Sequence, residues 1–396
     1  MKTRQQVWQG LVGALMMASA ALAQGQAAAP VRIGLDAEFS HLTSTADDAI
    51  RMGMLTAIDE INGAGGVLGG RKLELVERDN HSVPARGRVN FEELAGLQDL
   101  VAVFVSKFSP VALEQAPLAN ALKLPLLDPW AAADDIISDP PAGTYTFRLS
   151  LRDSWAIPAL LRHLQGRGFE RVGVMLPLSG WGRSNERMVE RHRASGAKPA
   201  IAGIEWYNWG TKSIAPLYDK LVVARSQAIL FVGNEGEASL LVKEIAGRPA
   251  ATRLPVASHW GVAGGDFVQL AGSSLDAVDF TIVQTFTFHG RRDARSAAVV
   301  ARAAKLFNLK AAEQIPSHVG FAHAYDLTHI LARAVALAGG TDRGKVRDAL
   351  EQVRNYEGLM GRFAQPFSAT SHEALSPAYL FMGRFNAAGT VVPFTR

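Results

Sequence analysis

The chain alternates between two hydrophobic patterns, one typical of buried strands and one typical of amphipathic helices. Residues 31–35 fit a strand, and the apolar residues Ile50, Met54, Ile58 and Ile61 then recur at helical spacing until a glycine-rich turn. The alternation continues with predicted strands at 71–76, 100–105 and 124–127 and predicted helices at 86–97 and 111–122. Strands that alternate with helices predict a mainly parallel sheet with helices on both faces.

A second series of the same kind begins after a predicted strand at 144–149. Its predicted helices lie at 155–165, 184–194 and 214–225, and its predicted strands at 172–176, 201–206 and 228–232. Apolar residues at helical spacing from Phe321 to Ala338 predict one further long helix, which ends at Gly339 and whose apolar face serves core packing. The pattern therefore predicts an α/β protein with two doubly wound parallel sheets.

The composition agrees with a large globular protein. Of the 396 residues, 48% are hydrophobic and 20% are charged, which supports a buried core and excludes disorder. Single hydrophobic cores stop growing at about 250 to 300 residues, so two domains are expected.

The N-terminus has the pattern of an export signal. Lys2 and Arg4 give a basic start, residues 7–20 are mostly apolar, and residues 21–23 (Ala-Leu-Ala) form a small-x-small cleavage site. The apolar run is shorter than the about 20 residues that a transmembrane helix needs. We therefore predict a signal peptide at residues 1–23 and a soluble periplasmic protein; a buried N-terminal helix is the alternative.

Charge and cysteine content narrow the possible partners. The sequence contains no Cys, so an exported chain must rely on its core for stability, which suits a large periplasmic protein. The net charge of +4 is small for this length, and the basic residues form no stripe with interleaved aromatics. This argues against a nucleic-acid partner.

Sequence motifs for common catalytic classes are missing. The chain has no GxxxxGK[ST] loop, no GxGxxG turn that opens a helix, no HExxH and no GxSxG. His318, His323 and His329 are spaced by five and six residues, which places them on different faces of a helix and argues against a metal site. We predict no cofactor, no metal and no catalysis, although a hydrolase without a recognisable sequence motif stays an alternative.

One loop carries a candidate anion site. After the predicted strand at 100–105, Ser109 stands at an expected N-cap position with Pro110 as the first helical residue, so free backbone N–H groups would face the loop. Such a helix start can hold an anion, and Lys107 would add positive charge. The alternative is an ordinary capped helix beside an exposed lysine.

Taken together, these segments resemble the leucine/isoleucine/valine-binding family of periplasmic receptors. The resemblance covers nearly all of the mature chain and is carried by the segments VRIGL, AIDEINGAGGVLGGRKLELVERDN, SKFSP, KLPLLDP, TYTFRLS, RVGVML, AILFVGNEGEASLLVKEI and AYDLTHILARAV. The resemblance implies a type I periplasmic binding protein fold, in which two doubly wound lobes are joined by three crossover segments and the ligand is enclosed between them. It implies a first lobe of residues 31–150 and 284–361 and a second lobe of residues 151–283 and 362–396.

Ligand-binding roles in the first lobe follow from the same resemblance. Ser109 corresponds to the serine that grips an amino-acid carboxylate from the helix start, with Lys107 adding charge. The next ligand loop corresponds to Trp130, Ala131 and Ala132, and the threonine that the family usually has there is missing.

The second lobe supplies the remaining candidates. Trp181 corresponds to the pocket aromatic, generally a tyrosine, and Trp260 stands where the family commonly has a glutamate that holds the ligand's ammonium. Glu235 is a possible replacement acid, and His259 a possible further donor. As alternatives, Trp130 and Trp181 are half-buried loop aromatics and Glu235 is an exposed residue at a helix start.

These assignments lead to a functional prediction. The chain is expected to be a monomeric solute-binding protein that delivers a small molecule to the membrane permease of an ABC importer. Because the ammonium-binding acid is replaced by a ring, the expected ligand is a carboxylate with an aromatic or flat apolar body, with amines and betaines as alternatives. A sensory protein of the same fold that reports to a signalling partner is the second interpretation.

Overall fold

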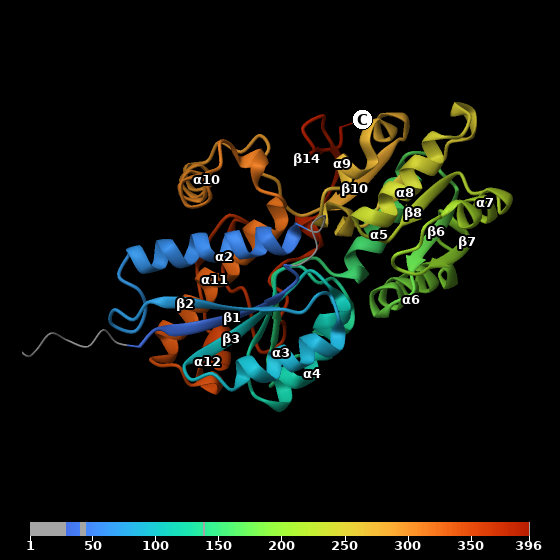
Figure 1. Cartoon of the computed structure of the whole chain (residues 1–396). Coiled ribbons are helices and arrows are strands. Elements are labelled where there is room, and N and C mark those ends of the chain that lie inside the picture. Colours follow the sequence, from blue (N-terminus) through green and yellow to red (C-terminus); the bar gives the residue numbers. More distant parts are fainter. Residues whose placement is uncertain (1–28, 40–44, 138, 396) are drawn as a thin grey trace, which may run out of the picture.

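The computed structural model describes residues 29–39, 45–137 and 139–395. Within these residues the chain forms two α/β lobes that lie side by side, the first containing the N-terminal strands and the second the middle of the chain (Figure 1). The predicted signal peptide at 1–23 lies outside the described residues. No helix of the described ranges is long and apolar enough to cross a membrane.

The first lobe is built on a five-stranded parallel sheet. Its strands are β1 (Val31–Ala37), β2 (Leu73–Asp79), β3 (Leu100–Val105), β4 (Leu126–Asp128) and β5 (Thr146–Arg148), in the order β2-β1-β3-β4-β5. Its helices are α2 (Ala46–Gly63), α3 (Pro84–Ala95), α4 (Ser109–Ala121), α10 (Ala294–Phe307), α11 (His318–Ala338) and α12 (Arg343–Leu350). Strand β3 is an unbroken apolar run because both faces of this sheet are covered by helices.

The packing of α11 against α2 closes one face of this lobe. A Cβ atom at Gly53 of α2 would lie 2.2 Å from the carbonyl oxygen of Phe321, so glycine is required for the two helices to approach this closely.

The second lobe is built on a seven-stranded sheet. Its strands are β6 (Arg171–Pro177), β7 (Ala200–Tyr207), β8 (Ala228–Phe231), β9 (Val256–Ser258), β10 (Phe280–Gln284), β13 (Phe381–Phe385) and β14 (Val391–Pro393), in the order β14-β13-β10-β9-β8-β6-β7. Its helices are α5 (Asp153–Gly166), α6 (Gly180–Ala194), α7 (Ala215–Val223), α8 (Glu235–Ala246) and α9 (Phe267–Ala271). The strands from β6 to β10 are parallel, whereas β13 and β14 are antiparallel. The predicted fold class, with two mainly parallel sheets, is confirmed.

The chain passes between the lobes after β5, after β10 and again before β13. Before the last passage, a short hairpin of β11 (Tyr356–Glu357) and β12 (Arg362–Phe363) leads into a segment that packs on the first sheet. In this segment the ring of Phe367 lies 5.1 Å from that of Phe147, and Glu373 pairs with Arg148. The third passage therefore lies after Glu373, later than the sequence-based boundary at 361, which placed these residues in the second lobe.

Candidate functional site

The candidate site is built from loops that follow parallel strands of both sheets. Lys107 and Ser109 follow β3, Trp130 follows β4, Trp181 lies at the start of α6 after β6, and Trp260 follows β9. Because the carboxyl ends of parallel strands meet at one edge of a sheet, these loops of the two lobes face each other. The structure therefore brings together residues that are far apart in the sequence.

These loops enclose a cavity of only about 10 Å³, about the space of one water molecule. It is lined by Lys107, Phe108, Ser109, Trp130, Ala132, Trp181, Asn234, Trp260 and Gly261. Six of the nine predicted residues line it, whereas Ala131, Glu235 and His259 do not. The resemblance did not assign Phe108, Asn234 or Gly261, although each is a sequence neighbour of an assigned residue.

Two tryptophans from opposite lobes fill most of this space. The ring centroids of Trp130 and Trp260 lie 5.0 Å apart, with 27° between the ring planes, so the two rings are stacked across the cleft. Both side chains are buried, as is Trp181. They are therefore part of the contact between the lobes, and the alternative of half-buried loop aromatics does not hold.

Ser109 is not the N-cap that the sequence suggested. It is the first residue of α4, and Phe108 occupies the N-cap position without a side-chain cap. The Ser109 Oγ instead accepts the backbone N–H groups of Ala132 at 3.1 Å and Ala133 at 3.3 Å, which tie the two first-lobe loops together. Since both lone pairs of the oxygen are used, the hydroxyl proton is available to an acceptor in the cavity.

Lys107 and Glu235 form a buried ion pair across the cleft. The Lys107 Nζ lies 3.7 Å from Glu235 Oε1 and 3.4 Å from the carbonyl oxygen of Gly264. Lys107 is 9% exposed and Glu235 is 6% exposed, so the alternatives of an exposed lysine and an exposed glutamate are both wrong. The Glu235 Oε2 is buried without a hydrogen-bond partner among the described residues. The Lys107 ammonium therefore lines the cavity, and the Glu235 carboxylate beside it has one oxygen that can accept a further hydrogen bond.

A third charged group, Asp47, holds the backbone of the Lys107 loop. Its Oδ1 accepts the backbone N–H of Lys107 at 2.9 Å, and its Oδ2 accepts that of Glu38 at 2.8 Å. Burial raises the pKa of Asp47 to about 6, although the nearby charge of Lys107 acts in the opposite direction.

His259 positions its neighbours and does not face the cavity. Its Nδ1 accepts the backbone N–H of Trp260 at 3.0 Å, so the ring proton lies on Nε2, which is 3.1 Å from Asp153 Oδ1. The same carboxylate oxygen accepts the indole N–H of Trp181 at 3.0 Å, and burial raises the pKa of Asp153. In the structure His259 thus helps to hold Trp181 and Trp260, while its role as a donor to the ligand stays a prediction.

His323 is a supporting residue that the sequence did not reveal. It lies on α11, where its Nδ1 is 2.9 Å from the carbonyl oxygen of Pro129 and its Nε2 is 3.0 Å from Thr285 Oγ1. Burial lowers the pKa of His323 to about 4. The neutral imidazole thus links the Trp130 loop to the second passage between the lobes.

Further contacts hold the lobes together around the cleft. The Asp134 N–H donates to Ser184 Oγ at 3.0 Å, and the Thr45 N–H donates to the Gly264 carbonyl at 3.0 Å. An exposed ion pair between Arg187 and Asp135 lies at 2.6 Å. The structure is thus a form in which the lobes are in contact and the cleft is closed.

The three histidines of α11 contact different partners and do not form one site. His318 bonds to Phe288 N–H, His323 to Pro129, and His329 lies 3.7 Å from Glu60. No group of three or more His, Asp or Glu side chains suited to a metal ion occurs in the described part of the chain.

Two α/β lobes that close on a small interlobe cavity define a two-lobed solute-binding protein. The model of the family described as Periplasmic binding protein matches residues 30–389, and the chain belongs to this family.

Individual relatives agree with this assignment. The Leucine-, isoleucine-, valine-, threonine-, and alanine-binding protein of Pseudomonas aeruginosa is 25% identical over 327 residues, which are 82% of this chain and 83% of the relative. A crystal structure of LivJ from Streptococcus pneumoniae in complex with isoleucine has a TM-score of 0.76 at 22% identity and covers 91% of this chain and 97% of its own. An ABC transporter solute-binding protein from R. palustris in complex with benzoate has a TM-score of 0.74 at 17% identity and covers 92% and 95%. The resemblance to the leucine/isoleucine/valine-binding family and the type I fold are confirmed.

Proposed function

We propose that this chain is the periplasmic solute-binding component of an ABC importer and that it captures a small carboxylate with a flat apolar body. The observation that carries the proposal is the stacked pair of Trp130 and Trp260, which face each other from opposite lobes beside Ser109 and Lys107. A flat ring fits between two such faces, and a carboxylate fits the hydroxyl proton and the ammonium next to them.

The distance between the two stacked rings shows that the cleft must open before a ligand ring can enter. Face-to-face packing needs roughly 3.5 to 4.0 Å on each side of a ring, so a ligand ring between the tryptophans requires them to stand roughly 7 to 8 Å apart. Their centroids are now 5.0 Å apart. The lobes must therefore separate before binding and close again on the ligand, which replaces one Trp–Trp contact with two Trp–ligand contacts.

The anionic group of the ligand would take over part of the Lys107–Glu235 contact. Both members are buried, so a ligand carboxylate that pairs with Lys107 leaves Glu235 in need of a new partner. The import of benzoate-type acids is supported by the R. palustris protein, whose crystal structure contains benzoate.

The same pair supports a second candidate ligand, an aromatic α-amino acid. A zwitterion would keep both charges matched, with its carboxylate on Lys107 and its ammonium on Glu235, whose Oε2 has no hydrogen-bond partner among the described residues. The Pseudomonas relative is named for amino acids and the Streptococcus relative was crystallised with isoleucine, which supports an α-amino acid as the ligand class, although none of these amino acids is aromatic. Both candidates share the flat apolar body between the tryptophans.

A purely binding role is supported by the hydrogen bonds of His259, whose ring nitrogens both have partners within the fold. The Nε2 of His259 faces Asp153 and its Nδ1 accepts the Trp260 N–H, so this ring has no nitrogen left to activate a serine hydroxyl. The relatives named as ABC transporter components favour import over sensing. The proposed partner is therefore a membrane permease, and the proposed route to the periplasm is the signal peptide at residues 1–23.

A thermal-shift screen of the purified protein tests this proposal. Aromatic acids, aliphatic acids, amino acids, amides and betaines are each added at the same concentration. A ligand at 100 times its Kd adds about 2.7 kcal/mol to the free energy of unfolding and raises the melting temperature. We expect aromatic carboxylates to give the largest shifts. A screen in which only aliphatic amides or betaines stabilise the protein would contradict the proposed ligand class.

A further inference from the structure

A second and larger cavity lies beside the cleft, between the same two lobes. Its volume is about 370 Å³, and it shares no lining residue with the cleft cavity. Gly264 lies between the two cavities, because its carbonyl oxygen accepts the N–H of Thr45, which lines the larger cavity, and the Nζ of Lys107, which lines the smaller one. The larger cavity is therefore a separate space and not an extension of the proposed solute site.

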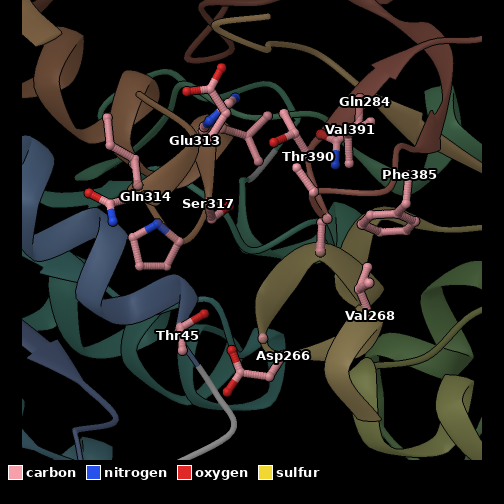
Figure 2. Close-up of a pocket in the computed structure, with 18 of the residues that line it drawn as sticks. Thr45, Asp266, Val268, Gln284, Glu313, Gln314, Ser317, Phe385, Thr390 and Val391 are labelled. Carbon is pink, nitrogen blue, oxygen red and sulfur yellow. The ribbon is translucent and has the colours of Figure 1, made fainter. Parts of the chain in front are cut away.

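The walls of this cavity come from both lobes (Figure 2). The segment before and at the start of α11 contributes Glu313 and Ser317, and the loop between β9 and α9 contributes Asp266. Gln284, the last residue of β10, lines the cavity where the chain leaves the second sheet. A molecule bound here would contact both lobes at once.

The charged residues of the cavity are all acidic at neutral pH. Asp266 and Glu313 line it from opposite sides, and none of the described lining residues is Lys or Arg (Figure 2). Within the described ranges, neither carboxylate belongs to an ion pair. Burial lowers the pKa of His318, which also lines the cavity, to about 4, so its ring is neutral. The cavity thus favours a positively charged occupant.

Two buried polar groups add a demand for hydrogen-bond donors. The Gln284 Oε1 and the Ser317 Oγ have no hydrogen-bond partner among the described residues, and these residues are only 2% and 4% exposed. Burial of an unpaired polar atom is unfavourable, so such atoms in a cavity wall indicate a group that completes them. A ligand with N–H groups meets this demand.

Apolar side chains make up the rest of the wall. Phe286, Val268 and Phe385 contribute hydrocarbon surface that a hydrated metal ion would leave unused. The described residues also include no cluster of three His, Asp or Glu that suits a metal. We propose that this cavity is a second binding site, distinct from the solute cleft, for a small organic cation: a protonated amine or diamine with a short hydrocarbon body, held between Asp266 and Glu313.

Calorimetry with 1,4-diaminobutane tests this site directly. We expect one diamine to bind per chain at pH 7, and the neutral analogue 1,4-butanediol to give no heat. Asp266→Asn and Glu313→Gln should each weaken diamine binding roughly tenfold or more, because each removes one charge-assisted contact. Glu357→Gln, which removes an exposed carboxylate on β11, is the matched control and should bind the diamine like the parent.

The two test positions are suited to substitution. Asp266 precedes α9 without a side-chain cap, and Glu313 is exposed, so neither change removes a side-chain hydrogen bond between described residues. Far-UV circular dichroism verifies that the variants are folded. Equal diamine binding by the parent and both variants, or the absence of heat with the parent, would overturn the proposal. Loss of diamine binding in Trp260→Ala but not in Asp266→Asn would place the amine in the cleft instead and would also overturn it.

Discussion

Replacing His323 by Asn removes a buried imidazole whose protonation is disfavoured in the folded structure. In the folded protein the pKa of His323 is about 4, against an ordinary value of 6.5, because the ring is fully buried. As the pH falls from 6.5 to about 4, His323 binds a proton in the unfolded chain but stays mostly neutral in the folded chain. The stability that depends on the neutral ring is therefore present above pH 6.5 and is lost by about pH 4.

The magnitude follows from the difference between the two pKa values. At about 1.36 kcal/mol for each pKa unit, the neutral ring accounts for about 3 kcal/mol of pH-dependent stability. Buried carboxyls act in the opposite direction, because burial raises the pKa of Asp36 and of Asp128 to about 7. These groups are present in both proteins, so the difference between parent and variant isolates His323.

Urea unfolding at pH 7.5, 6.0 and 4.5 measures this difference. At pH 7.5 the His323→Asn variant should be less stable than the parent, because Asn cannot reach both Pro129 and Thr285. This deficit should shrink by up to about 3 kcal/mol towards pH 4.5. A deficit that stays constant for His323→Asn over this range would refute the reasoning.

Three further predictions concern the cleft. Ser109→Ala should weaken binding of the anionic ligand by about 1.5 to 3 kcal/mol in calorimetry, while Ser273→Ala, at an exposed position, should not; unchanged affinity in Ser109→Ala would place the anion elsewhere. Glu235→Gln should leave benzoate binding intact but abolish any binding of phenylalanine, and equal losses for both ligands would show that Glu235 supports the cleft without contacting an ammonium. Because thin passages between lobes permit hinge motion, we expect the free protein in solution to open the cleft and to close it again on the ligand, so small-angle scattering should give a smaller radius of gyration at ligand saturation than without ligand; no change at saturation would contradict hinge closure.

The two sheets could be predicted from the sequence because local signals determine them. The unbroken apolar run of β3 and the helical spacing in α2 each depend on neighbouring residues and on burial, and the alternation of such elements defines the topology. The positions of the site loops follow from the same logic, since they come after parallel strands.

The contacts within the site could not be predicted, because they join residues that are distant in the sequence. The stack of Trp130 on Trp260 and the ion pair of Lys107 with Glu235 each connect two lobes. The orientation of the Ser109 hydroxyl depends on where the loop after β4 passes, which local propensity does not specify.

The third passage between the lobes was misplaced for a related reason. The segment up to Glu373 contains no long strand or helix, so its pattern gives no sign of the lobe on which it packs. Its place is fixed by tertiary contacts of Phe367 and Glu373 with the end of the first sheet.

The most direct test of the proposed function is calorimetry of benzoate with the parent protein, Trp130→Ala and Trp155→Ala. Trp155 lies on α5 outside the cleft cavity and provides the matched control. Benzoate should bind the parent and the Trp155 variant with one site per chain, and the loss of Trp130 should cost about 2 kcal/mol or more. Binding that is unaffected by Trp130→Ala, or tight binding of leucine and glycine betaine without any heat from aromatic acids, would contradict a cleft built to hold a flat carboxylate between two tryptophans.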